Sequence, residues 1–168
     1  ILNLRGDAIM QQAKVFRKIE NNKYIFKLTE YPETKSYSEL IKFEKNNGFR
    51  QVIINSEIMI KIIMNVLQND SFVLRSIVFN DTVDSEYREE IDYKVRGLKK
   101  NPLLLTELVT DLSWASEKNS IDIEKIDLAY EVSGEFESVT IICNGVISGT
   151  NLNYFFENYL KKSLEESF

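Results

Sequence analysis

The spacing of hydrophobic and polar positions divides the chain into short strands and helices. In residues 23–30 the pattern alternates, with Tyr24, Phe26 and Leu28 on one side, which predicts a half-buried strand. Similar β-rich runs predict four more strands, at residues 49–55, 71–80, 121–132 and 136–148, the last with a bend at Asn144-Gly145.

Helical spacing of apolar residues predicts five helices, at residues 36–45, 57–69, 82–100, 101–115 and 151–166. In the helix at 57–69 only Lys61, Asn65 and Gln68 form a polar stripe, so we expect protein to surround it on nearly all sides.

The first apolar residues of the chain fit two secondary structures. Ile9, Ala13, Phe16 and Ile19 have helical spacing after a capping residue, Asp7, which favours a helix. The alternative is a strand at 15–19 that turns at Asn21-Asn22.

The order of these elements predicts an α+β fold. Strands and helices alternate in the middle of the chain, and a C-terminal β-hairpin is followed by a final helix. We therefore expect a single mixed β-sheet of about five strands covered by helices. The length fits one globular domain over residues 1–168, and the missing initiating methionine leaves open a longer parent chain.

The absence of histidine limits the chemistry of this chain. Without an imidazole there is no Ser–His or Cys–His nucleophile pair and no histidine-bound metal. The single cysteine, Cys143, cannot form an internal disulfide and indicates a reducing compartment, so we expect a cytoplasmic protein. The most apolar stretch, residues 58–67, is too short to span a bilayer, so no membrane partner is expected.

Acidic residues gather after the predicted strand at 71–80. Asp81 and Asp84 are candidate Mg²⁺ ligands, because carboxylates that converge on this ion serve phosphodiester chemistry. The competing interpretation is a solvated helix face, because i,i+4 spacing pairs Asp84, Glu90 and Asp92 with basic residues. We favour the solvated face and expect no cofactor, with Mg²⁺ as the alternative.

Two further carboxylates lie on one face of the strand predicted at 121–132. Asp127 and Glu131 stand about 13 Å apart at strand spacing, too far to share one metal ion. Solvation of an edge strand explains them better.

Basic charge is concentrated in the first third of the chain. Residues 1–60 have a net charge of +3, whereas residues 61–168 have −8. In one stretch cations interleave with aromatic residues, a pattern that can bind nucleic acid; these cations are Lys14, Arg17, Lys18, Lys23 and Lys27. An amphipathic element with its lysines in solvent explains the stretch more simply, so nucleic acid is not an expected partner.

The last predicted helix has more aromatic residues than one face needs. Tyr154, Phe155 and Tyr159 cannot all face one sheet at 100° per residue, and exposed aromatic residues are enriched at interfaces. This pattern predicts a non-catalytic protein-interaction or regulatory domain of a soluble bacterial or phage protein, with another protein or a second copy as partner. The alternative is a metal-dependent nuclease or nucleic-acid-processing domain that uses the acidic residues.

Overall fold

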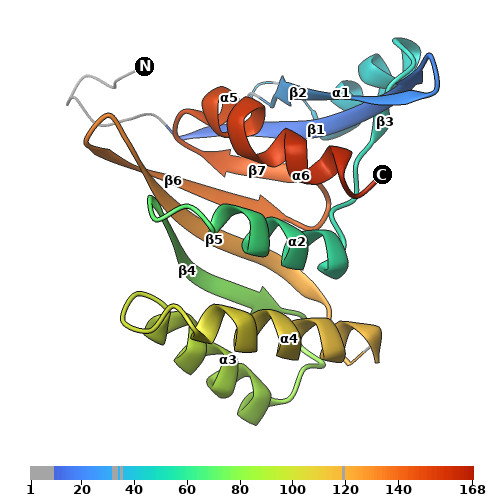
Figure 1. Ribbon diagram of the computed structural model, residues 1–168. Helices are drawn as coiled ribbons and strands as arrows, with labels where there is room; N and C mark the ends of the chain where they lie inside the picture. The colour runs from blue at the N-terminus through green and yellow to red at the C-terminus, as the bar shows by residue number, and fades with distance from the viewer. Residues whose placement is uncertain (1–9, 32–33, 35, 119) are drawn as a thin grey trace.

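The computed structural model describes residues 10–31, 34, 36–118 and 120–168 and shows one antiparallel sheet with helices (Figure 1). The strands lie in the order β2-β1-β7-β6-β5-β4, and the short β3 pairs with β1. They are β1 (Gln11–Glu20), β2 (Lys23–Glu30), β3 (Arg50–Gln51), β4 (Phe72–Phe79), β5 (Ile123–Val132), β6 (Glu135–Ile142) and β7 (Val146–Gly149). The α+β class is confirmed, but the sheet is antiparallel and larger than the predicted mixed sheet of about five strands.

The helices are α1 (Tyr37–Asn46), α2 (Ser56–Val66), α3 (Ser85–Gly97), α4 (Leu104–Glu117) and a C-terminal helix of three parts. Those parts are α5 (Leu152–Phe155), a π-helical turn η1 (Phe156–Leu160) and α6 (Lys161–Glu165). In Figure 1, α2 and the C-terminal helix lie across the sheet, while α3 and α4 lie beside β4. In the described part of the chain, no helix has the length and hydrophobicity needed to cross a membrane.

The helix predicted for the first apolar residues is wrong, because this segment forms strand β1. Ala13, Val15 and Phe16 are buried, so β1 is covered on both of its faces. A strand buried on both faces loses the alternating pattern and can mimic helical spacing. Asn21 and Asn22 adopt positive φ angles of 50° and 59° and form the turn to β2, as the alternative interpretation required.

Helix α2 contributes strongly to the hydrophobic core, as its apolar surface predicted. Met59, Ile62 and Ile63 are fully buried, and α2 packs against α4, α6 and β5. The helix begins where Asn55 accepts a hydrogen bond of 3.0 Å from the backbone N–H of Ile58. The strand predicted at 49–55 shortens to two residues, and the backbone then bonds at Val52 to β1 and at Ile54 to Cys143.

Candidate functional site

A groove opens between the outer strand β4 and the connection from α3 to α4. Its volume is about 410 Å³, within the range of about 300–1,000 Å³ that is usual for ligand pockets. Its walls come from the α2–β4 loop, from β4, and from the end of α3 with the start of α4. The lining residues are Leu67, Asn69, Asp70, Phe72, Val73, Leu74, Arg75, Val95, Arg96, Leu98, Lys99, Pro102 and Leu105.

Strand β4 lines this groove with its edge. It pairs with β5 only, so its other side has no strand partner among the described residues. Four consecutive residues, Phe72 to Arg75, border the groove, although successive side chains of a strand point to opposite faces. This is the arrangement of a strand approached from its edge. A register irregularity at Arg75 interrupts the pairing with β5, and such bulges redirect a side chain.

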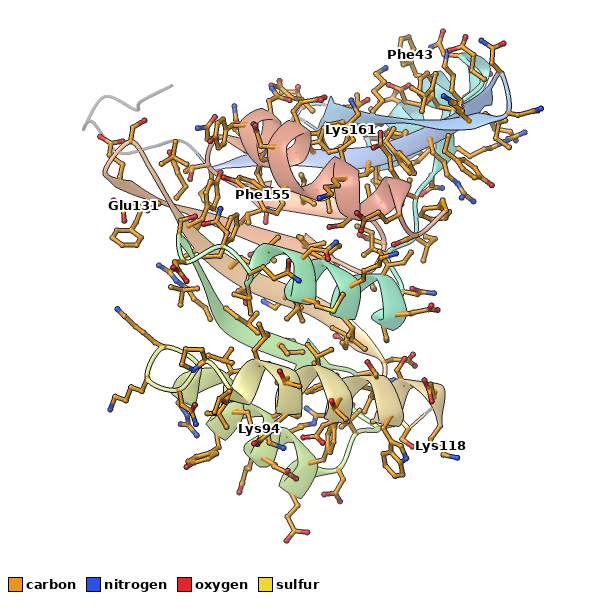
Figure 2. The ribbon with its side chains drawn as sticks, viewed as in Figure 1. Phe43, Lys94, Lys118, Glu131, Phe155 and Lys161 are labelled. Atoms are coloured by element: carbon orange, nitrogen blue, oxygen red, sulfur yellow. The ribbon has the colours of Figure 1, made fainter. Side chains whose placement is uncertain are left out.

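Helices α3 and α4 are held as a pair by polar contacts outside the groove. Lys94 donates to Glu90 at 2.6 Å and also forms an ion pair with Asp111 of α4. Partial burial lowers the pKa of Lys94, but its hydrogen bonds to Asp111 and Glu90 outweigh burial and raise that pKa overall. Figure 2 shows Lys94 between the two helices. This clamp fixes the end of α3, and with it the wall of the groove.

Three cations stand at the groove and have no anionic partner among the described residues. Arg75, Arg96 and Lys99 are exposed, and none forms an ion pair or side-chain hydrogen bond with another described residue. The spacing that predicted an Asp92–Arg96 pair therefore does not produce one. Only one carboxylate, Asp70, belongs to the lining. The groove thus offers an apolar surface bordered by positive charge, which suits a ligand that is both apolar and anionic.

Lys14, the first cation of the predicted nucleic-acid stretch, is completely buried. Its ammonium group donates to the carbonyl oxygens of Val52, at 3.1 Å, and of Asn144. Burial lowers the pKa of Lys14 to about 8, opposed by the nearby Cys143. Lys14 is therefore a structural link between β1 and two loops and cannot reach a phosphate group from this position.

Arg17 and Lys18 also have partners within the chain. The guanidinium of Arg17 lies 4.1 Å from the ring centre of Phe168 and 5.0 Å from that of Tyr24. Lys18 pairs with Glu20 at 3.4 Å. Lys23 is exposed at the start of β2, next to the turn from β1. Lys18 and Lys27 both lie over the ring of Phe49, at 5.3 and 5.2 Å from its centre, but Lys14 is buried and Arg17 packs on Phe168, so the five cations do not share one surface.

Lys27, the last member of the stretch, holds α1 against β2. Its ammonium donates to the fully buried carboxylate of Glu44 at 2.8 and 3.0 Å, and the hydroxyl of Thr29 donates to the same carboxylate at 2.8 Å. The sequence pattern did not identify this buried ion pair, because Glu44 lies in an otherwise solvated part of α1.

The C-terminal helix uses most of its aromatic surface internally. Phe155 is fully buried, so its predicted place on an exposed interface is corrected; Figure 2 labels it between the helix and the sheet. Tyr159 is half-buried, and its ring packs against Phe72 with a centre-to-centre distance of 4.7 Å. Tyr154 remains 38% exposed. The π-turn η1 shifts the register from the assumed 100° per residue, so more aromatic side chains reach the core.

The predicted magnesium ligands lie on an exposed turn and a helix cap. Asp84 caps α3 and accepts from the backbone N–H of Glu86 at 2.8 Å, and Asp81 is exposed in the turn before it. Over the described ranges, no three side chains among cysteine, histidine, aspartate and glutamate come together to hold a metal ion. The nuclease alternative stays a prediction.

Asp127 has a different environment from the solvated edge expected for it. Strand β5 lies between β4 and β6, so Asp127 is in the interior of the sheet. Its carboxylate accepts from the hydroxyl of Ser76 at 2.6 Å and from that of Thr140 at 2.5 Å, and Lys125 lies 3.8 Å away. These contacts tie three strands together and leave the carboxylate satisfied.

Comparisons of this chain with protein-family models, with curated proteins and with solved structures give no match.

Proposed function

We propose that this chain is a non-catalytic interaction domain that binds a partner protein in the groove beside β4. The observation that supports it most directly is the set of three cations around an apolar hollow that form no ion pair within the described ranges of the chain. Cations that lie close together on a surface repel one another. An anionic partner relieves this repulsion, so the groove favours a ligand with negative charge. A cytoplasmic location fits the single thiol, Cys143.

The edge of β4 favours an extended peptide as the class of ligand. An edge strand presents backbone N–H and C=O groups that a partner segment can pair with, while pockets beside it select side chains. Here the apolar lining, including Leu98 and Leu105, can receive an aliphatic or aromatic side chain, and Arg75 and Lys99 can pair with neighbouring acids. The expected ligand alternates acidic and apolar residues.

A labelled model peptide tests this proposal. The probe is a fluorescein-labelled heptapeptide in which glutamate alternates with valine and phenylalanine, measured by fluorescence anisotropy. We expect binding that weakens as salt rises, and a loss of about tenfold or more in affinity for Arg75→Glu, about 1.4 kcal/mol. Arg50→Glu, on exposed β3, is the matched charge control and should bind like the wild type.

Three results would overturn the proposal. One is no binding of the acidic peptide at low salt, and another is equal binding of a peptide in which lysine replaces every glutamate. The third is an affinity that falls as much in Arg50→Glu as in Arg75→Glu, because this would show a general charge effect instead of a site. Circular dichroism of each variant confirms that the fold is retained.

A further inference from the structure

The tip of the β5–β6 hairpin carries acidic side chains and an exposed aromatic residue, which complement the basic and apolar groove. The two strands join through Ser133 and Gly134, whose φ angles of 55° and 84° fit a tight two-residue turn. Beside this turn, Phe136 is 70% exposed, one of the most exposed large hydrophobic residues of the described chain. Glu135 and Glu137 flank it along β6, and Glu131 lies opposite it on β5.

The three acids of this tip have no partner in the described part of the chain. Glu131, Glu135 and Glu137 form no ion pair and no side-chain hydrogen bond with another described residue. A single exposed aromatic residue needs no special explanation. Glu131 shares a sheet face with Phe136, whereas Glu135 and Glu137 point to the opposite face, so the tip presents an exposed aromatic residue with acids on both of its faces. Such a tip complements an apolar groove bordered by cations that form no ion pair with another described residue.

We propose that a second copy of this chain inserts its β5–β6 hairpin tip into the groove beside β4; this inference rests on the proposed function of that groove. Phe136 would enter the apolar hollow, and the acids at the tip would face Arg75, Arg96 and Lys99. The hairpin tip then supplies the partner segment of acidic and apolar residues.

The positions of tip and groove favour a closed pair of molecules. Phe72, in the groove, pairs with Tyr130, next to the tip, and the backbone N–H of Glu131 donates to the carbonyl of Ser71 at 3.1 Å. The acidic tip and the basic groove therefore lie at the same end of the sheet; Figure 2 labels Glu131 there. In a symmetric dimer of the proposed kind, a two-fold rotation would bring each tip to the other molecule's groove, so that both contacts form at once.

The same charges disfavour the simpler dimer in which two β4 edges pair directly. That arrangement places Arg75 and its neighbouring cations of one molecule near those of the other, and like charges across an interface repel. When the acidic tip lies in the groove instead, its carboxylates attract the same cations. Charge complementarity therefore selects the tip as the occupant.

Two charge-reversed proteins test this dimer. The first has Glu131→Lys and Glu135→Lys, so its tip and its groove are both basic. The second has Arg75→Glu and Lys99→Glu, so its tip and its groove are both acidic. All four residues are exposed in the folded chain, which should keep each protein folded. Sedimentation velocity over a wide range of protein concentration gives the association state.

We expect the wild type to form dimers, and each reversed protein alone to associate at least about tenfold more weakly. A mixture of the two should form dimers again, because the basic tip now meets the acidic groove while the acidic tip of the second protein meets the basic groove of the first. Phe136→Ser should also weaken the wild-type dimer. Phe43→Ser is the matched control, since Phe43 is 61% exposed on α1, away from the hairpin (Figure 2).

The proposal fails if the wild type stays monomeric at every concentration while the model heptapeptide still binds the groove; the proposed function then stands with a different partner. It also fails if the dimer persists in both reversed proteins, because another surface, such as the C-terminal helix around Tyr154, would then form it. If neither dimer nor peptide binding occurs, both proposals are wrong. If the mixture does not associate, the tip does not occupy the groove.

Discussion

The β1–β2 end and the β4 end of the sheet both carry several cations, but most of those in the basic stretch of β1 and β2 have partners within the chain, whereas the three at the groove form no ion pair with another described residue. At the β1–β2 end, backbone carbonyls hold Lys14, aromatic rings hold Arg17, and the buried carboxylate of Glu44 holds Lys27. At the β4 end, Arg75 and Lys99 face a hollow without an ion pair among the described residues. A basic stretch in a sequence therefore predicts a binding surface poorly, since the chain can use its own cations to fix its loops and helices.

Two glycines with positive φ angles give the largest expected contrast, between the packed loop beside Lys14 and the open β5–β6 hairpin turn. Gly145 has φ +79°, and a Cβ there would overlap the carbonyl oxygen of Val52 and approach the Lys14 ammonium. Gly145→Ala should lose about 3 kcal/mol of unfolding free energy, because backbone strain of about 1–2 kcal/mol adds to overpacking of about 1–3 kcal/mol. Gly134, in the hairpin turn, has φ +84° and open space around it, so Gly134→Ala should lose only about 1 kcal/mol.

Urea denaturation of both glycine variants measures these losses. Equal losses of unfolding free energy would contradict the tight packing of Gly145 against Val52 and Lys14. A Gly145→Ala protein that cannot be isolated folded, next to a folded Gly134→Ala protein, agrees with the prediction.

The buried Lys14 predicts a rise in stability at alkaline pH. The pKa of Lys14 is about 8 in the folded chain, below the usual 10.5 of a lysine, so the unfolded chain binds more protons between these values. Unfolding free energy should therefore rise with pH from about 8 to about 10.5, by about 3 kcal/mol. Burial raises the pKa of Tyr87 to about 12, aided by the charge of Asp111, and this lowers stability only above about pH 10.

Lys14→Met isolates the contribution of the lysine. The variant leaves two carbonyls without their donor at every pH, but it should remove the rise between pH 8 and pH 10. Urea titrations of both proteins at several pH values give the difference. If the unfolding free energies of the wild type and the variant change in parallel with pH, the charge of Lys14 is not unfavourable in the folded chain. The pKa of Lys14 would then be that of a surface lysine.

A third contrast neutralises one cation at each end. Lys27→Met leaves the carboxylate of Glu44 buried with Thr29 as its remaining donor, which should cost about 2 kcal/mol; the partial exposure of Lys27 keeps this below the cost of a fully buried pair. Arg75→Met should change stability by less than about 0.5 kcal/mol, because Arg75 is exposed and forms no ion pair with the residues that the structure describes. A loss for Arg75→Met as large as that for Lys27→Met would show a structural role for the groove cation.

The sequence predicted α2 and α3 better than it predicted β1, for physical reasons. Their apolar periodicity and their caps are local, and the helices formed where those signals lie. Strand β1 pairs with β7 and is bound by the loops at Val52 and Asn144, which are distant in sequence. Its two-sided burial therefore erased the local strand signal.

The groove could not be predicted from the sequence for the same reason. Its lining comes from three separated segments, and the missing partners of Arg75, Arg96 and Lys99 are visible only when the surrounding side chains are placed. The i,i+4 spacing of Asp92 and Arg96 even suggested that one of these cations was paired. For the C-terminal helix, the number of aromatic residues was clear, but the π-turn that directs Phe155 and Phe156 into the core has no local sequence signal that we can identify.

The smallest expected effect concerns nucleic acid at the β1–β2 end. Since Lys14, Arg17, Lys18 and Lys27 have partners within the chain, Lys23 is the cation of this stretch with most freedom to contact a phosphate. Binding of a labelled oligothymidylate should be weak at low salt, and Lys23→Glu should change the slope of log affinity against log salt by no more than about 1. Lys18→Glu should change it less than Lys23→Glu, because Lys18 already pairs with Glu20. Fluorescence anisotropy across a salt series gives each slope. A steep slope that flattens strongly in Lys18→Glu would mean that these cations release their internal partners for phosphate, and the distinction between the two ends of the sheet would then be lost.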